Sequence, residues 1–217
     1  MGDAPLSALN ALGLGFVGLA FSAQALAGKD IAECETAKAQ LVAQYALIKD
    51  MPDAEFASHT SLTRLEYTAM LGTAQQMKDG LSAMPRDAQT RMKQLLLFSS
   101  AWYGRLDNVQ YLVGQGADVN YAHGTMSAPL VVAAQCGGPQ VAKFLIASHA
   151  NLYTRLPNMP DAMVAALTSN ANGTIAVLFD AGYDPCLATQ RAGKPSAAQV
   201  ALRLGHQDIA PRLSCMK

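Results

Sequence analysis

The sequence has few aromatic side chains and no excess of charge of either sign. Aromatic residues make up 6% of 217 residues, and 16 basic residues balance 16 acidic ones. A protein that binds DNA or RNA displaces counterions with clustered Lys and Arg side chains, and no such run is present. We therefore do not expect a nucleic-acid partner. Ala and Leu are abundant in a chain that is 51% hydrophobic, and both residue types favour helices over sheets.

Charge is also missing from residues 4–28. The apolar stretch in this segment is followed by Ala25 and Ala27, an A-x-A pattern that predicts a secretory signal peptide over residues 1–27. The first five residues depart from that pattern, because they contain Asp3 and no Lys or Arg. An uncleaved membrane anchor is the alternative, but Gly, Ser, Asn and Gln dilute its hydrophobicity. Cleavage predicts a periplasmic or secreted protein with no stable membrane span.

The same segment contains glycines at the spacing of a dinucleotide-binding fingerprint: Gly13, Gly15 and Gly18. That fingerprint must follow a β-strand and begin a helix within a βαβ unit. Residues 1–12 do not read as a core strand, and no parallel-sheet pattern follows. These glycines are therefore interpreted as part of the apolar leader.

Motifs for catalysis and for metal binding are absent. There is no nucleophile elbow, no paired-carboxylate motif and no phosphate loop. The four cysteines form no C-x-x-C pair and have no His at zinc-ligand spacing. The histidines are His59, His123, His149 and His206, and only His123 is a candidate for binding. We predict a non-enzymatic protein with no cofactor and no metal.

An internal repeat occupies the second half of the chain. The segments "SAWYGRLDNVQYLVGQGADVN", "AAQCGGPQVAKFLIASHANLY" and "ALTSNANGTIAVLFDAGYDPC" place Gly104, Gly137 and Asn170 at equivalent positions, a period of 33 residues. A fourth copy places Gly205 there after a two-residue insertion. Apolar residues recur in each copy at helical spacing. They are Val109, Leu112, Val141, Phe144, Leu145, Ile175, Leu178, Ile209 and Leu213.

These segments resemble the ankyrin-repeat family. "GADVN" at 116–120 is similar to the end of an ankyrin repeat, "SAPLVVAAQCGG" at 127–138 to its beginning, and "LGHQDIAPRL" at 204–213 to its second helix. The third copy departs from the pattern, because Asp161–Met163 replaces T-P-L. The resemblance implies an all-α solenoid of helix-turn-helix units. The predicted units are capping helices over 28–60, a degenerate first repeat over 61–95, and repeats over 96–126, 127–159, 160–192 and 193–217.

Partners of ankyrin repeats dock on the concave face formed by loops and inner helices. The resemblance therefore implies contact residues just before each turn and in each loop. The predicted partner-binding residues are Trp102, Tyr103, His123, Met126, Gln135, Thr168, Ser169, Arg191, Lys194 and Arg203. The alternative for Trp102 is a core position against the first repeat. The expected partner is another protein, bound by a monomer.

Four cysteines allow three pairings, and the sequence alone does not choose among them. Cys186 and Cys215 both fall near the outer edge of the last repeat, so that pair is favoured and Cys34–Cys136 remains. Export would place all four in an oxidising compartment.

Three functions agree with these features. The first is a periplasmic binding protein that inhibits a toxic hydrolase, in the manner of an immunity protein. The second is a scaffold or protective factor for an envelope or stress-response enzyme. The third is an effector that binds a host protein, in which case the cysteines would remain reduced.

Overall fold

The computed structural model describes residues 31–215 except 61, 125, 158 and 189–194. All regular elements among these residues are helices, which confirms the predicted all-α class, and the only β-type pairing described is a bridge between His123 and Met126. The predicted signal peptide and the predicted contact residues Arg191 and Lys194 lie outside the described residues. In chain order the elements are α3 (Ile31–Ile48), α4 (Asp53–His59), α5 (Arg64–Leu71), α6 (Ala74–Ser82), α7 (Arg86–Trp102), α8 (Leu106–Gly114), α9 (Pro129–Val132), the π-helix η1 (Ala133–Gly137), α10 (Pro139–Ala147), α11 (Ala162–Thr168), α12 (Asn172–Asp180), α13 (Pro185–Ala188), α14 (Ala197–Arg203) and the 3-10 helix η2 (Ala210–Leu213).

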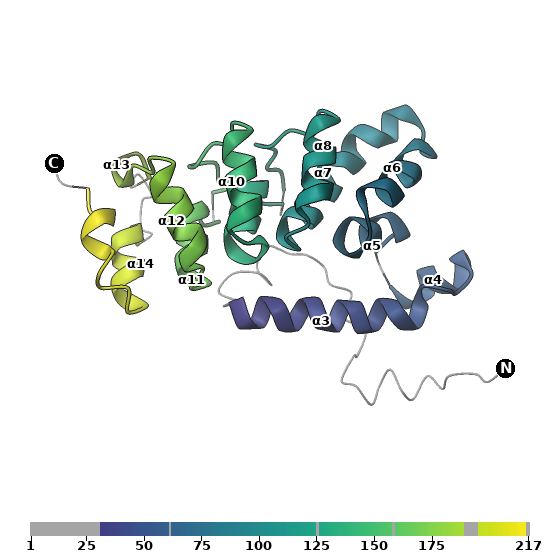
Figure 1. The fold of residues 1–217 in the computed structure, drawn as a ribbon, viewed down its shortest axis with the longest axis horizontal. Coiled ribbons are helices and arrows are strands. Elements are labelled where there is room, and N and C mark those ends of the chain that lie inside the picture. Colours follow the sequence, from purple (N-terminus) through teal and green to yellow (C-terminus); the bar gives the residue numbers. More distant parts are fainter. Residues whose placement is uncertain (1–30, 61, 125, 158, 189–194, 216–217) are drawn as a thin grey trace.

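From α5 onward the helices form a row of antiparallel pairs (Figure 1). We number them as the first pair (α5, α6), second (α7, α8), third (α9–η1, α10), fourth (α11, α12) and fifth (α14, η2). Leading helices pack on the leading helices of neighbouring pairs, and from α6 to α12 trailing helices pack on trailing ones. The apolar residues expected inside the repeats are buried here, with Phe144 and Ile209 only partly so. No pair could bury both of its faces alone, so the row supplies the core.

The turn within each pair repeats in its hydrogen bonds. The amide N–H groups of Arg105, Gly138, Ala171 and His206 each donate to the carbonyl five residues earlier. Such bonds satisfy carbonyls that would otherwise be left free at a helix C-terminus. The turn residues Gly104, Asn170 and Gly205 have φ values of 73°, 54° and 85°.

The third pair differs, because its last turn is the π-helix η1 and the positive φ, 87°, falls on Gly138 instead of Gly137. Gly137 is needed for another reason. A Cβ atom there would lie 1.9 Å from the carbonyl oxygen of Ala101 in α7. The glycine of the repeat therefore allows close backbone contact between the second and third pairs.

The turn between successive pairs repeats as well. Gly116, His149 and Gly182 have φ values of 80°, 67° and 80°, and they follow one another at intervals of 33 residues. After each, an amide N–H (Ala117, Ala150 or Tyr183) donates to a carbonyl of the preceding helix. His149 thus occupies the left-handed position that glycine occupies in the neighbouring pairs.

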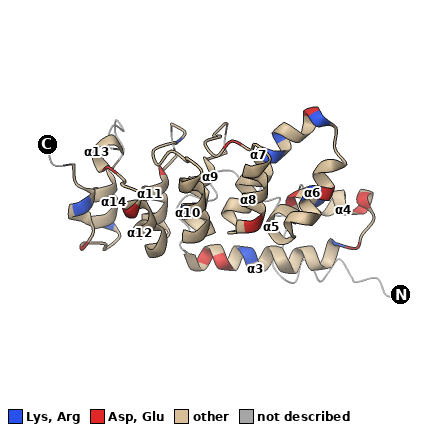
Figure 2. Ribbon diagram, turned by 45° about the horizontal axis from the view of Figure 1, so that its top comes forward, with Lys and Arg blue, Asp and Glu red and all other residues tan. Residues whose placement is uncertain are grey.

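Polar side chains join the loops along the row. The Asn120 amide donates to the His149 carbonyl at 3.2 Å and accepts from the Asn151 amide N–H at 2.7 Å. One pair further on, the Tyr153 hydroxyl accepts from the Asp184 N–H at 2.8 Å. These bonds fix the spacing of the loops. Charged residues are sparse over the middle pairs and gather at the ends of the row and on α3 (Figure 2).

Candidate protein-docking surface

The C-terminal ends of α7, η1 and α11 carry half of the predicted contact residues. Trp102, Tyr103, Gln135 and Ser169 are 2%, 7%, 5% and 0% exposed, so these side chains are not available to a partner in this conformation. For Trp102 the alternative interpretation, a core position, matches its burial. Burial also raises the pKa of the Tyr103 hydroxyl, because the phenolate would be desolvated.

Helix α3 occupies part of this surface. It runs along the row of pairs instead of closing its N-terminal end, which differs from the predicted cap (Figure 1). Its buried residues Cys34, Leu41 and Ile48 recur every seven residues and so lie on one face. Ile31 and Leu47 of the same helix are exposed. The seven-residue spacing was the signal that could have indicated a lengthwise helix.

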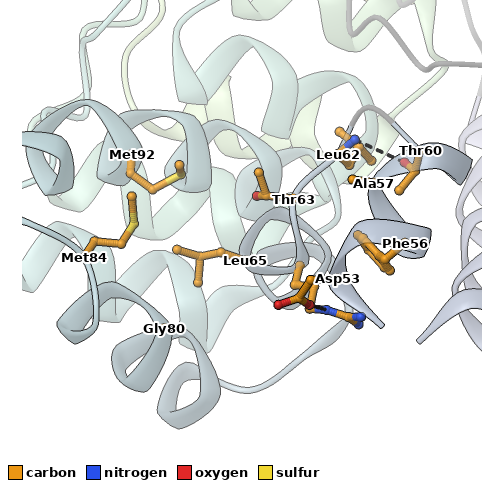
Figure 3. A pocket seen from close by; sticks show the side chains of 11 residues that line it. Asp53, Phe56, Ala57, Thr60, Leu62, Thr63, Leu65, Gly80, Met84 and Met92 are labelled. Atoms are coloured by element: carbon orange, nitrogen blue, oxygen red, sulfur yellow. Dashed lines mark hydrogen bonds and ion pairs between the residues drawn. The ribbon is translucent and has the colours of Figure 1, made fainter. Parts of the chain in front are cut away.

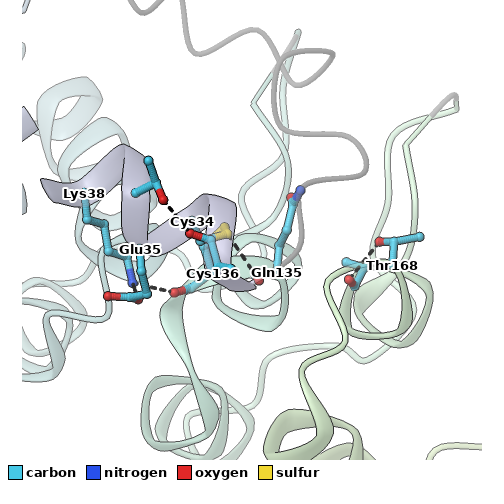
Figure 4. The surroundings of a disulfide bond; sticks show 9 residues. Cys34, Glu35, Lys38, Gln135, Cys136 and Thr168 are labelled. Atoms are coloured by element: carbon cyan, nitrogen blue, oxygen red, sulfur yellow. Dashed lines mark hydrogen bonds and ion pairs between the residues drawn. A yellow bond between two sulfur atoms is a disulfide. The ribbon is translucent and has the colours of Figure 1, made fainter. Parts of the chain in front are cut away.

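A disulfide joins the N-terminal part of α3 to the third pair. Cys34 is bonded to Cys136 of η1, with Cα atoms 5.6 Å apart and 102 residues of separation (Figure 4). The Cys34 sulfur lies 3.7 Å from the carbonyl oxygen of Gln135. Cys34–Cys136, the pairing that remains once Cys186 is paired with Cys215, is therefore present. It links α3 to the residue next to Gln135, a predicted contact residue.

Two hydrogen bonds flank that disulfide. The Lys38 ammonium donates to the Cys136 carbonyl at 2.7 Å and pairs with Glu35 at 2.9 Å. The backbone N–H of Ile31 donates to the carbonyl of Ser169 at 3.0 Å, one pair further along. Carbonyls at a helix C-terminus carry partial negative charge, so a cation there is favourable. Helix α3 thus satisfies backbone groups at the ends of both η1 and α11.

The C-terminal part of α3 packs against the first pair. The rings of Tyr45 and Tyr67 stack with centroids 4.8 Å apart, and Phe56 of α4 meets Tyr67 edge-on at 5.7 Å. Burial raises the pKa of Tyr67. Arg64 donates to the carbonyls of Lys49 and Met51, which follow α3. The helix is therefore held to the first, third and fourth pairs.

The remaining described contact residues are accessible. His123 and Arg203 are exposed, and Met126 and Thr168 are half-buried. The Thr168 hydroxyl donates back to the carbonyls of its own helix, at 3.0 Å for Val164 and 2.9 Å for Ala165. His123 and Met126 are joined by two backbone hydrogen bonds and lie together at one loop tip, whereas Arg203 belongs to the fifth pair. The accessible residues thus lie at three places along the row, because Thr168 ends α11 of the fourth pair.

The sequence did not single out an apolar surface on the fifth pair. Leu202 and Leu204, on either side of Arg203, are 57% and 49% exposed. Leu167 is the counterpart of Leu202 in the fourth pair, three residues before the turn, and it is fully buried. A second disulfide, Cys186–Cys215, holds the chain end of this pair, with Cα atoms 4.8 Å apart. This is the pairing that the sequence favoured.

A pocket of about 610 Å³ lies at the other end of the row, between α4, α5, α6 and α7 (Figure 3). Phe56, Leu65, Met84 and Met92 give it a mainly apolar lining. Arg64 at its edge is engaged by Asp53 at 2.8 Å and lies 4.2 Å above the Phe56 ring. Its polar lining residues are Asp53, Thr60, Thr63 and Arg64.

The described residues contain no cluster of three or more His, Cys, Asp and Glu side chains with the geometry of a metal site. Among the helices of residues 31–215, none combines the length and the apolar character that a bilayer span requires. The sequence matches no protein-family profile, and no curated protein is significantly similar to it.

Proposed function

We propose that this chain is an exported bacterial ankyrin-repeat protein that binds another protein and catalyses no reaction. The observation that carries the proposal is that the turn between pairs recurs every 33 residues. Each time, a residue with positive φ stands at the equivalent position and the same backbone hydrogen bond follows it. That period and helix-pair unit are typical of ankyrin repeats. Proteins built in this way present extended surfaces to partners.

The two disulfides support export. Disulfides persist in oxidising compartments such as the bacterial periplasm and are rare in the cytosol. A protein acting inside a host cytosol would have its cysteines reduced, so the effector hypothesis is the weaker one. Intact-mass measurement of the periplasmic protein is expected to give a chain beginning at Gly28 and lighter by four hydrogens than its reduced form. A chain that retains residues 1–27 would contradict the cleavage.

The proposed docking surface takes three of the accessible contact residues, His123 and Met126 at one loop tip and Arg203 on the fifth pair, and adds Leu202 and Leu204 beside Arg203. Arg is enriched among residues that dominate interface energetics, and exposed apolar side chains next to it add buried area. Trp102 does not belong to this surface, because it is buried. A Trp102→Ala variant would therefore test stability and not docking.

The test is capture of periplasmic proteins by the oxidised chain, followed by titration with the purified partner. His123→Ala with Arg203→Ala is the test variant. The control pairs two exposed residues of the trailing helices, Gln110→Ala in α8 with Lys143→Ala in α10. We expect the test variant to weaken binding by at least tenfold and the control to bind normally. Equal binding by both variants would remove this surface assignment.

A further inference from the structure

The C-terminal ends of η1 and α11 combine two features. They are the positions at which a partner of the repeats is expected, and they are the positions at which α3 is bonded. Gln135 and Cys136 lie near the C-terminus of η1, and Ser169 follows α11. The contacts of α3 there are the Cys34 disulfide, the Lys38 ammonium on the Cys136 carbonyl and the Ile31 N–H on the Ser169 carbonyl. The chain therefore occupies part of its own predicted docking surface.

One face of α3 contacts the row, and Ala37 and Tyr45 are partly buried on it. Cys34, Leu41 and Ile48 are buried, whereas Ile31 and Val42 are 42% and 53% exposed. The outer residues Glu33 and Glu35 face solvent. An isolated helix of 18 residues is marginally stable in water, so a covalent link adds to this packing in holding α3 in place. Cys34–Cys136 is that link.

We propose that Cys34–Cys136 is a redox-controlled lock. In the oxidised chain α3 covers the ends of η1 and α11. In the dithiol chain α3 leaves them, and an amphipathic helix of the partner protein with apolar residues at the same seven-residue spacing binds in its place. This regulation rests on the binding function proposed above, and it adds the class of segment that is bound.

The lock is closed and opened by thiol–disulfide exchange with a dithiol oxidoreductase. For opening, a carrier thiolate attacks one protein sulfur and the S–S bond breaks, giving a mixed disulfide and a protein thiolate. The second carrier thiolate then displaces the protein sulfur. Two electrons pass from the carrier dithiol to the protein, which takes up two protons as its cysteines become thiols. Closing is the reverse, with an oxidised carrier as the electron acceptor.

Access distinguishes this disulfide from the other one. Cys34 and Cys136 are 1% and 5% exposed, whereas Cys186 and Cys215 are half-buried. A thiolate must reach the sulfur along the S–S axis, so the first turns of α3 must detach before Cys34–Cys136 reacts. The Ile31 and Lys38 hydrogen bonds lie on either side of Cys34 and oppose that detachment. The lock is therefore slow to open, and its rate depends on those bonds.

The first experiment follows reduction of the folded chain by dithiothreitol, with quenched alkylation and mass spectrometry of each cysteine. We expect Cys186–Cys215 to be reduced first. Lys38→Met should accelerate reduction of Cys34–Cys136 about tenfold and leave Cys186–Cys215 unchanged. Lys49→Met, just beyond the same helix, is the control and should change neither rate. Equal rates for both disulfides in the parent, or no effect of Lys38→Met, would overturn the lock.

The second experiment measures opening without any partner. In the full chain carrying Cys34→Ser and Cys136→Ser, amide hydrogen exchange over residues 31–48 should be about a hundredfold faster than in the oxidised parent. A fluorescent peptide of residues 29–50 with Cys34→Ser should bind this variant and not the oxidised parent. The parent reduced by dithiothreitol should give the same two results, in case the double variant folds poorly.

The two proposals fail in different ways. Unchanged exchange over α3 in both the variant and the reduced parent would overturn the lock and leave docking at His123 and Arg203 untouched. Faster exchange with no peptide binding would also overturn it, because the vacated surface would then recognise no helix. Normal partner binding by the His123→Ala and Arg203→Ala variant would instead remove the proposed docking surface without affecting either redox measurement.

Discussion

The first four pairs and the fifth pair are stabilised in different ways. Helix α3 contacts the first, third and fourth pairs and is fixed to η1 by a disulfide that spans 102 residues. The fifth pair lies beyond the end of α3 and has a local disulfide that spans 29 residues. Its leading helix ends in exposed leucines, whereas the equivalent Leu167 is buried. The covered region is thus closed by the chain itself, and the uncovered region is open to a partner.

The difference shows that equivalent positions of a repeat need not have equivalent roles. Ser169 and Leu204 both immediately precede a turn residue, Asn170 or Gly205. The first has its carbonyl bonded to α3 and is fully buried, and the second is 49% exposed. A repeat pattern assigns both to the docking face. Helix α3, which lies outside the repeats, contacts the first of these positions through the Ile31 N–H.

We expect the largest change in the free energy of unfolding when each disulfide is removed in a separate variant. In the chain-entropy model, loops of 102 and 29 residues correspond to about 4.7 and about 3.6 kcal/mol of stability. Cys34→Ser with Cys136→Ser should therefore lower the free energy of unfolding more than Cys186→Ser with Cys215→Ser. Urea denaturation of the two double variants measures this difference. The reverse order would mean that α3 adds little to the stability of the row.

A substitution at the joint between the second and third pairs should have the next largest effect. Gly137→Ala places a Cβ atom 1.9 Å from the Ala101 carbonyl oxygen, so α7 and η1 must separate. We expect a loss of about 3 kcal/mol, because the clash is with backbone. Gly114→Ala is the control, since its Cβ meets nothing within 4 Å and should be neutral or stabilising. Thermal unfolding of both variants tests the requirement for close contact.

Alkaline pH should lower the free energy of unfolding, because the first and second pairs contain buried tyrosines. The pKa of Tyr103 and that of Tyr67 are raised above 10.0 in the folded chain. The unfolded chain therefore loses these protons first, and stability should fall as the pH rises above about 10, by up to about 1.4 kcal/mol per pH unit for each tyrosine. Tyr103→Phe should reduce that slope relative to the parent in denaturation measured from pH 8 to 11. An unchanged slope would contradict the burial of this hydroxyl.

The smallest effect concerns a turn between pairs. His149 has a φ of 67°, where its neighbours in the repeat are glycines. His149→Gly should raise the free energy of unfolding by about 1 kcal/mol, because a side chain in left-handed geometry is strained. Gly116→Ala, at the equivalent turn, should lower it by a similar amount. Calorimetry of both variants measures the two opposite shifts.

The repeat period and the apolar spacing were sufficient to predict the helix pairs. The 33-residue interval placed the turns at Gly104, Asn170 and Gly205, and the structure has them there. At the third pair the expected turn glycine, Gly137, has a different role, since the left-handed residue is Gly138 and Gly137 allows contact with α7. Local hydrogen bonding is encoded locally, but backbone contact between two pairs depends on how they stack. That contact could not be deduced from the spacing.

The candidate site was less predictable than the fold. The sequence correctly favoured Cys186–Cys215, because both cysteines fall near the outer edge of the last repeat. It placed Trp102 among the partner-binding residues, with a core position as the alternative, and that side chain is 2% exposed. Exposure depends on segments far away in sequence, which a repeat motif does not describe. The exposed Leu202 was missed because its position marks a core residue, Leu167, in the preceding pair.

The sequence by itself determined the helices, the turns between them and the cysteines available for pairing, because these depend on residue type and on neighbours within one or two turns. Only the tertiary structure decided that α3 lies along the row and that Cys34 reaches Cys136 across 102 residues. It also decided which ends of the leading helices remain exposed. These outcomes depend on the packing of whole helices, where many small contacts between distant segments compete.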